Sequence, residues 1–468
     1  MCFGSDAKRI NIFLALLLIF ATVTLCGCSS GGEASDSQAS SYVLPVQTPS
    51  ADPSEKWGFP SLNGTERNYD YKGADFRILY SSNSENDIFS SSDSTATEYD
   101  KSVAHRNEEI EKKLGIVMKK ELSTEVCDTV LKLEKSDDSP ELVYASGGDG
   151  ISELMLYGCI ESLYETGDAD ITMLGVSVSA VRQLSVYGQV YMLTGAPMRS
   201  CVDRTSVVAY DYEMMKKLGY ATDFFEELVL EEKWTLDRMH SISKQASATL
   251  DAGFDIEFSG ASDARYYLWK GLGAVTVVKI GGDVPEVAVY SGKNVRYFEN
   301  VARFSDSVGG IAENGDSLFY IGTIRDSADN FACDFGILPT PAGNEGAEYR
   351  CVLDFKNTYF TVIPKNTENK RMSYDFLYEL YGASSDTVYP LTVKNNAYKS
   401  ERILDVVLKS RYFDFLDMYG IGHIVSTAFY ANENTSDFDA LLNTRAQFAV
   451  EALDIALRQT VGEPNLKQ

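Results

Sequence analysis

Apolar and polar positions alternate along the body of the chain with two different periods. Residues 76–80 read Phe-Arg-Ile-Leu-Tyr and are rich in strand-forming side chains, which predicts a strand. Further on, Val103, Ile110 and Leu114 recur at helical spacing among charged residues, and Gly115 follows, so we expect a helix over 99–114. Strands that alternate with helices in this way indicate doubly wound α/β lobes.

The same alternation continues through the rest of the chain. From 373 to 460 most segments read as helix, with loops expected near 388–400 and 431–437. No internal repeat is evident, so a solenoid or a propeller is not expected. The body has about 400 residues, more than one core usually spans, so two lobes are expected. Further strands are predicted at 116–118, 140–145, 205–210, 316–321, 335–338 and 360–363, and helices at 151–157, 212–218, 299–312 and from an N-cap at Thr235.

Near the beginning of the sequence, residues 10–25 form one apolar run preceded by Lys8 and Arg9. Its roughly 15 residues fall short of the ~20 that a membrane-spanning helix needs. A basic start, a short apolar middle and small residues behind it are typical of a secretory signal peptide. The alternative is an anchor helix that stays uncleaved, and in either case we expect the body to be exported and held at a membrane.

The apolar run ends in Leu25-Cys26-Gly27-Cys28, which resembles the lipobox of bacterial lipoproteins. The resemblance implies that residues 1–27 are removed and that Cys28 receives the lipid and becomes the mature N-terminus. Cys26 fits this pattern poorly as the acylated residue. Residues 28–70 are rich in Ser, Gly and Pro and are predicted to be a disordered tether, because they offer too little apolar surface to fold.

Composition narrows the choice of partners. The formal net charge is −26, so the body is expected to be repelled by nucleic acid and by an anionic membrane surface. No Cys-x-x-Cys pair is present, and the loop 251–255 does not have the ligand spacing of an EF-hand, so neither a metal nor another cofactor is expected. One or two disulfides are possible among the five cysteines of the body, Cys127, Cys159, Cys201, Cys333 and Cys351.

The sequence contains no complete catalytic motif of the kinds considered below. The segment 175–179, Gly-Val-Ser-Val-Ser, fails the Gly-x-Ser-x-Gly nucleophile motif at its last position. No His-Glu-x-x-His is present, and His105, His240 and His423 are the only histidines of the sequence. We therefore predict that the protein is not an enzyme.

Six segments occur in the order that they have in a known family. The chain resembles the extracellular, sugar-binding, lipid-anchored solute-binding proteins of ATP-binding-cassette importers. Two departures are the Asp at 211, where the family usually has Asn, and the short 251–255 loop. The segments are 106–115, 187–195 (Tyr-Gly-Gln-Val-Tyr-Met-Leu-Thr-Gly), 207–219 (ending in Leu-Gly), 233–237 (Lys-Trp-Thr-Leu-Asp), 314–319 and 334–341.

The resemblance implies a fold and a division of the chain. It implies a two-lobed, type II periplasmic-binding-protein-like α/β fold, in which two doubly wound lobes are joined by a hinge and the ligand binds between them. Lobe 1 would comprise 71–204 and 340–395, and lobe 2 would comprise 205–339 and 396–468. Trp234 is expected to be structural, because it stands at a helix entrance.

The resemblance also implies where a ligand would be contacted. A sugar is recognised by aromatic rings against its C–H face and by polar or charged side chains on its hydroxyls. The residues that family position selects are Ser82, Asn83, Gly148, Asp149, Tyr210, Asp211, Asp263, Tyr266, Tyr267, Trp269, Tyr320 and Thr323.

The function implied is capture of a carbohydrate or related small solute at the extracellular face of the cell membrane. The expected partners are that ligand, a membrane permease and the membrane itself through the lipid on Cys28, with the protein acting as a monomer. The alternative is a surface lipoprotein hydrolase, or an adhesion or sensory protein, that acts on glycans.

Overall fold

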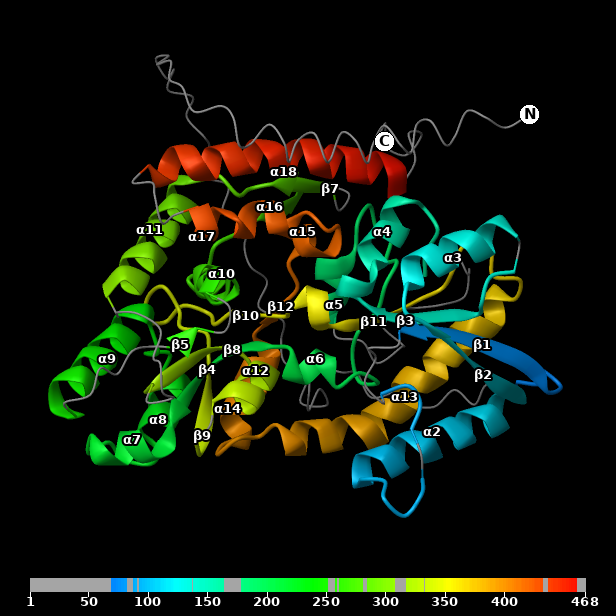
Figure 1. Ribbon diagram of the computed structural model, residues 1–468, viewed down its shortest axis with the longest axis horizontal. Helices are drawn as coiled ribbons and strands as arrows, with labels where there is room; N and C mark the ends of the chain where they lie inside the picture. Colours follow the sequence, from blue (N-terminus) through cyan, green and yellow to red (C-terminus); the bar gives the residue numbers. More distant parts are fainter. Residues whose placement is uncertain are drawn as a thin grey trace. The chain divides into compact units, whose positions relative to one another are not determined.

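Two four-stranded sheets organise the computed structural model (Figure 1). It describes residues 69–81, 87–90, 92–136, 138–163, 178–250, 257–258, 261–280, 284–307, 317–331, 333–431 and 437–460. In hydrogen-bonding order, the first sheet, called sheet 1, contains β11 (Tyr359–Val362), β3 (Leu142–Ser146), β1 (Ala74–Ser81) and β2 (Ile116–Ser123). The second, called sheet 2, contains β5 (Glu257–Phe258), β8 (Phe319–Thr323), β4 (Ser206–Asp211) and β9 (Phe335–Pro339).

Sheet 1 is mostly parallel. β1 pairs in parallel with β2 and with β3, while β11 joins β3 antiparallel at the outer position. β3 reads Leu-Val-Tyr-Ala-Ser and is buried at every position, as expected of a central strand covered on both faces. The predicted strands at 76–80, 116–118, 140–145 and 360–363 are thereby confirmed, each within a few residues.

Helices cover sheet 1 on both faces. α2 (Glu98–Leu114) and α13 (Lys370–Asn395) lie on one side, and α3 (Val126–Lys135) and α4 (Ile151–Leu156) lie on the other (Figure 1). α2 begins with a capping box between Thr97 and Asp100 and ends at Gly115, whose φ of 68° is the left-handed conformation that glycine adopts without strain. Phe76 of β1 stacks on Phe376 of α13 with ring centroids 4.2 Å apart.

Sheet 2 is mixed. β4 pairs antiparallel with β8 and β9, and β5 pairs parallel with β8. The residues of β4, β8 and β9 are all buried. The helices between these strands are α7 (Tyr212–Lys217), α8 (Phe224–Leu230), α9 (Leu236–Leu250), α10 (Ala261–Gly271), α11 (Gly292–Ser307) and α12 (Ile324–Asn330).

The chain passes between the two sheets at adjacent places. The first passage leads into β4, and the second leads through residues 353–358 into β11. Thr205 and Leu353 form an antiparallel bridge, and the Asp354 N–H donates to the Arg204 carbonyl at 3.0 Å, so the two passages run side by side. The chain leaves α13 for α14 (Glu401–Lys409), which packs against β9, and this is a third passage. The lobe boundaries given above stay predictions.

Smaller elements complete the fold. Two-stranded pairs form between β6 (Val277–Ile280) and β7 (Val284–Val287), and between β10 (Cys351–Val352) and β12 (Arg411–Tyr412). The short 3-10 turns that matter below are η1 (Gly147–Asp149) and η3 (Phe355–Asn357). The remaining helices are α5 (Val178–Leu184), α6 (Ser200–Asp203), α15 (Phe415–Met418), α16 (Gly422–Ser426), α17 (Ala428–Ala431) and α18 (Phe438–Thr460).

One predicted loop is wrong in part. Residues 388–395 were expected to lie in a loop, but they continue α13, with Pro390 inside the helix. A proline in a helix interior costs about 3 kcal/mol. Here Val388 packs with Tyr99 and Val103 of α2, so burial of this face against α2 offsets that cost.

Trp234 and the cysteines of the body were also subjects of sequence-based expectations. Trp234 is fully buried and its indole N–H donates to the Pro339 carbonyl at 2.8 Å, which agrees with a structural role. No disulfide joins the five cysteines of the body, which all lie in the part of the chain that the structure describes, and four of them are buried. Among the described residues, no helix is long and apolar enough to cross a membrane.

Candidate functional site

The strands of sheet 1 end at one edge where polar residues gather. β1 and β3 run parallel, so their carboxyl ends meet there, and the antiparallel β11 begins there with Tyr359 opposite Ser146. Asp87 follows β1 a few residues further along the chain. Open α/β sheets bind ligands at the carboxyl ends of their strands. This edge is therefore the place at which a site is expected.

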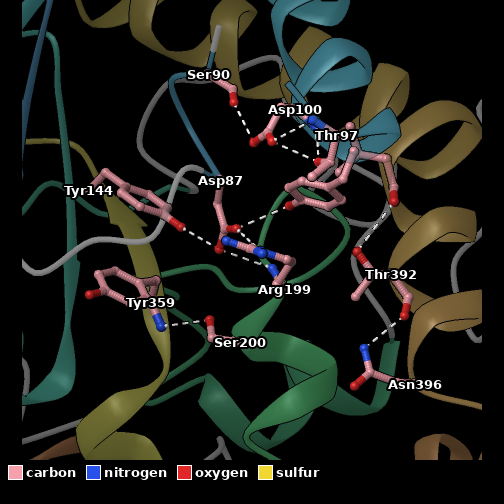
Figure 2. A network of polar contacts seen from close by, with 12 residues as sticks. Asp87, Ser90, Thr97, Asp100, Tyr144, Arg199, Ser200, Tyr359, Thr392 and Asn396 are labelled. Atoms are coloured by element: carbon pink, nitrogen blue, oxygen red, sulfur yellow. Dashed lines mark hydrogen bonds and ion pairs between the residues drawn. The ribbon is translucent and has the colours of Figure 1, made fainter. Parts of the chain in front are cut away.

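Asp87 lies at the centre of a buried polar network at this edge (Figure 2). Its side chain is 1% exposed. Oδ1 accepts hydrogen bonds from the Tyr99 hydroxyl at 3.0 Å and Arg199 Nε at 2.8 Å. Oδ2 accepts from the Tyr144 hydroxyl at 3.1 Å and the Arg199 backbone N–H at 3.0 Å. Four donors fill the acceptor capacity of a carboxylate, so Asp87 is a residue that positions its neighbours.

The neighbours of Asp87 come from distant parts of the chain. Tyr99 belongs to α2, Tyr144 to β3, and Arg199 stands before α6. The Asp87 carbonyl also accepts a hydrogen bond from Nη2 of the buried Arg106, at 3.0 Å. A buried carboxylate is stable only when it is paired and hydrogen bonded, so these elements must assemble together around it.

The two phenols of this network remain proton donors over a wide pH range. Burial first, and the Asp87 charge next, raise the pKa of Tyr99 and of Tyr144 well above the ordinary value of 10. Each hydroxyl therefore keeps its proton and its hydrogen bond to Asp87 at any physiological pH.

A second set of contacts fixes the segment after Asp87. The Ser90 hydroxyl donates to Asp100 at 2.7 Å, and the Asp100 side chain also closes the capping box with Thr97 (Figure 2). The hydrogen bonds from Ser90 and Thr97 lower the pKa of Asp100 below its ordinary value. The segment is thus tied to the first turn of α2 by a carboxylate that stays ionised.

An aromatic pair stands beside the network. The rings of Tyr144 and Tyr359 are stacked with centroids 5.1 Å apart and planes 12° apart. The Tyr359 N–H donates to the Ser200 hydroxyl at 3.0 Å, which joins the start of β11 to α6 (Figure 2). The hydroxyl of Tyr144 is already oriented by Asp87, so the pair is held in one arrangement.

Gly148 and Asp149 form the turn that follows β3. The Asp149 side chain accepts hydrogen bonds from the Ser146 N–H and hydroxyl, at 2.9 and 2.8 Å. At Gly147 an added Cβ would lie 2.4 Å from the Phe355 carbonyl oxygen, so only glycine lets η1 approach η3. The predicted residues Gly148 and Asp149 therefore lie beside the second passage between the sheets.

Thr323 lies beside the first passage. It ends β8 opposite Ser206, and its hydroxyl caps α12 by accepting from the Asp326 N–H at 3.1 Å. Arg204 Nη1 lies 3.7 Å from Asp326 Oδ1. Because the two passages are adjacent, Thr323 and the Gly148–Asp149 turn both border the junction of the two sheets.

Tyr210, Asp211 and Tyr320 lie further along sheet 2. Asp211 is five residues beyond Ser206 on β4, which places it about 16 Å away along an extended strand. Its side chain caps α7 by accepting from the Met214 N–H at 2.8 Å. Tyr320 pairs with Ala209 near the same end, and its hydroxyl accepts from Asn330 at 3.3 Å. The structure does not bring these three residues together with Thr323.

The aromatic candidates of α10 are packed in the interior. Tyr266, Tyr267 and Trp269 are all buried, and the Trp269 indole N–H donates to the Asn294 carbonyl at 3.0 Å. Tyr266 and Trp269 also contact the ring of Phe429 edge-on. In this arrangement the rings contribute to the core around α10 and α17.

Several predicted residues have no described environment. Cys28, Ser82 and Asn83 lie outside the described residues. Asp263 lies in α10, and its side chain is outside the described part as well. Their roles stay predictions.

The residues that gather at the edge of sheet 1 are not among those predicted from the sequence. Asp87 is one of 68 acidic residues, and no local pattern distinguishes it. Arg199 and Tyr144 are separated from it by 112 and 57 positions, so only the fold brings them together. The one available signal was position, because Asp87 and Tyr144 both stand close to the end of a predicted strand. Among the described residues, no cluster of three or more His, Cys, Asp or Glu side chains is arranged to hold a metal ion.

Comparisons with known proteins identify the fold. No protein-family model matches the chain, and no curated protein matches it. Solved structures do match. The cyclic alpha-maltosyl-1,6-maltose binding protein from Arthrobacter globiformis aligns with a TM-score of 0.58 and 10% identity, over 81% of this chain and 99% of its own.

Two further structures give the same result. The sugar-binding protein MalE from the phytopathogen Xanthomonas citri has a TM-score of 0.56 and 12% identity, over 83% of this chain and 99% of its own. An ABC substrate-binding protein from Listeria monocytogenes in complex with cycloalternan has a TM-score of 0.51 and 13% identity, over 82% of this chain and 99% of its own. The predicted two-lobed α/β fold is confirmed.

Proposed function

We propose that this protein, which has the two-lobed fold of solute-binding proteins, captures a carbohydrate for an ATP-binding-cassette importer. The observation that supports this most strongly is the alignment over 99% of the sugar-binding protein from Arthrobacter globiformis. Such a protein performs no reaction, and its work is a hinge motion that closes two lobes over a ligand. The signal-peptide and lipobox patterns support an exported protein that is anchored through Cys28 and hands its ligand to a membrane permease.

The junction of the two sheets is the proposed place of binding. Gly148, Asp149 and Thr323 border the two adjacent passages of the chain, and Arg199 and Tyr359 are held nearby by Asp87 and Ser200. We propose that these residues contact the ligand. Tyr210, Asp211 and Tyr320, at the other end of sheet 2, are proposed to matter less.

A binding panel tests the function. The full chain in detergent is screened against neutral and charged mono- and oligosaccharides by thermal shift, followed by calorimetry of any positive. We expect at least one glycan to raise the midpoint of unfolding by a few degrees, because a ligand that binds only the folded state stabilises it. No shift with any glycan, or turnover of a glycan by the purified protein, would contradict the proposal.

Two matched variants test the location. Asp149→Asn and Asp211→Asn each replace a carboxylate that caps a turn or a helix by a neutral amide. If the ligand binds at the junction, Asp149→Asn weakens binding by about tenfold, since a hydrogen bond to a charged group contributes about 1.5–3 kcal/mol. Asp211→Asn leaves the affinity within about twofold. A larger loss of affinity in Asp211→Asn than in Asp149→Asn would place the site at the other end of sheet 2.

A further inference from the structure

A lysine joins the β6–β7 pair to helix α5. Lys279, on β6, donates through Nζ to the Arg182 carbonyl at 2.6 Å, to the Ser185 carbonyl, and to the Ser185 hydroxyl at 3.2 Å. Its ammonium also lies 5.3 Å from the ring centroid of Phe415. The contact spans 94 positions of the sequence and is separate from the three passages of the chain between the sheets.

The two partners of this contact are attached to different four-stranded sheets. The segment that follows α5 is fixed to sheet 1, because Leu193 and Thr361 of β11 exchange backbone hydrogen bonds of 3.1 and 2.8 Å. β6 follows α10, and α10 packs against β8 of sheet 2. The Ala288 N–H, just after β7, donates to the Thr276 carbonyl at 2.7 Å and holds the pair closed on the α10 side.

The chemistry of the contact is that of a helix C-terminal cap. The last carbonyls of a helix have no partner within the helix and carry partial negative charge. A lysine ammonium satisfies them with charge-assisted hydrogen bonds. A second contact from the same side reaches α5, since the Phe413 N–H donates to the Gln183 side-chain oxygen at 2.7 Å. α5 is therefore held by two groups that lie outside sheet 1 and its helices.

We propose that Lys279 is a latch between the two lobes, and that it sets the equilibrium between two lobe arrangements in the absence of ligand. The structure contains the latched arrangement. A ligand that favours another arrangement must open the contact between Lys279 and α5, so the latch sets the ligand affinity through the population of the competent state. Only this consequence for affinity depends on the proposed function.

The test compares Lys279→Met with the wild type. Methionine keeps an unbranched apolar side chain of similar length and removes the three donors. Dyes are attached by click chemistry to azido residues placed at the exposed positions Glu108 on α2 and Lys244 on α9, in the full chain in detergent. Single-molecule energy transfer then reports the distance between the lobes without any ligand.

We expect Lys279→Met to change the ratio of the two inter-dye populations by about fivefold or more, the lower end of what allosteric couplings supply. The matched control is Lys293→Met, an exposed lysine on α11 whose ammonium lies near the ring of Tyr297, and it should leave the ratio unchanged. Ser185→Ala removes one of the three acceptors and should have a smaller effect than Lys279→Met. Circular dichroism and the unfolding midpoint establish that each variant is folded.

The outcomes separate this proposal from the proposed function. Identical distributions for folded Lys279→Met and wild type overturn the latch, whatever ligand the protein binds. A changed distribution supports the latch even if no glycan binds. Where a glycan does bind, its dissociation constant should change in Lys279→Met by the factor that the ligand-free populations give.

Discussion

Asp87 illustrates how much a single residue organises in this protein. Its carboxylate accepts hydrogen bonds from Tyr99, Tyr144 and Arg199, and its carbonyl accepts one from Arg106. These contacts connect the segment after β1 with α2, β3 and α6 at the edge of sheet 1. The energy of such a network is cooperative, because each member is costly to leave unpaired in the interior.

Replacing Asp87 tests this at the residue scale. In Asp87→Asn the charge is lost, and the new amide NH₂ faces groups that are themselves donors. We expect a loss of about 3–5 kcal/mol in the free energy of unfolding, the range for breaking a buried ion pair by removing one partner. Urea unfolding measures it. The control is Asp75→Asn, an exposed aspartate on β1, which should change the stability by less than about 0.5 kcal/mol.

The buried hydroxyl of Tyr349 predicts how the stability of the fold depends on pH. Its hydroxyl donates to the Val229 carbonyl and accepts from the backbone N–H of Trp234, and burial raises its pKa from 10.0 to about 12. The folded state then holds a proton that the unfolded state releases. This contribution to stability is complete below pH 10 and is lost as the pH rises from about 10 to about 12. Other buried tyrosines, such as Tyr210 with a pKa of about 12, act in the same direction.

The measurement is the free energy of unfolding in urea across the alkaline range. We expect it to be flat just below pH 10 and to fall above it, with tyrosinate absorbance rising as the protein unfolds. In Tyr349→Phe the free energy of unfolding should fall less steeply with pH, and it should be about 1 kcal/mol lower than in the wild type at neutral pH. An unchanged slope in Tyr349→Phe would show that this hydroxyl does not contribute.

At the scale of elements, one buried ion pair joins α10 to the start of α15. Lys270 and Asp414 are both buried and in direct contact, and the Thr276 hydroxyl donates to Asp414 at 2.8 Å. Asp414 also caps α15 by accepting from the Leu416 N–H at 2.9 Å. The ammonium of Lys270 lies 5.0 Å from the ring centroid of Tyr412 on β12. The pair thus fixes the segment that contains Arg411, whose guanidinium donates a hydrogen bond to the Cys201 carbonyl.

A double-mutant cycle measures the coupling of this pair. Lys270→Met leaves the Asp414 charge buried without its cation, so we expect it to cost at least about 3 kcal/mol. Lys270→Met combined with Asp414→Asn should cost less than the sum of the single changes by about 1 kcal/mol or more, because the remaining charge is removed as well. Additive costs, determined by urea unfolding, would mean that the two side chains do not interact.

At the scale of the whole molecule, the two-lobed fold agrees with the binding function that we propose. In the function that we propose, the two sheets enclose a ligand at their shared junction, and the enclosing motion is the signal to a permease. A net charge of −26 disfavours direct contact with anionic surfaces, so the membrane attachment that we propose requires a separate device. We propose that the lipobox-like end of the apolar run provides one.

The anchor is tested by two serine substitutions in an expression host that acylates lipoproteins. Cys28→Ser should abolish incorporation of a clickable fatty acid and release the protein from the membrane fraction, because the thiol is the acylated group. Cys26→Ser removes an adjacent cysteine within the predicted signal peptide and should leave labelling intact. Labelling that survives Cys28→Ser would place the lipid elsewhere.

The sequence by itself determined the local elements and the class of fold. Apolar periodicity and Gly115 behind the helix are properties of neighbouring residues, so they are readable without the fold, and the helix predicted over 99–114 agrees with α2 within one residue. The order of six family-like segments indicated two lobes, and the structural comparison confirmed that fold. The helix through Pro390 was missed because its stability comes from packing against α2.

Only the tertiary structure decided which side chains meet. The segment around Asp87, β3 and the start of α6 have no common pattern in the sequence, yet they share one carboxylate. Thr323 and Asp211 are both among the residues that family position selects, but strand register separates them by the length of β4. Hydrogen bonds between distant segments depend on register and on the packing of layers, and neither is encoded in the residue types of one segment alone. For the same reason, the latch of Lys279 on α5 is a property of the assembled fold.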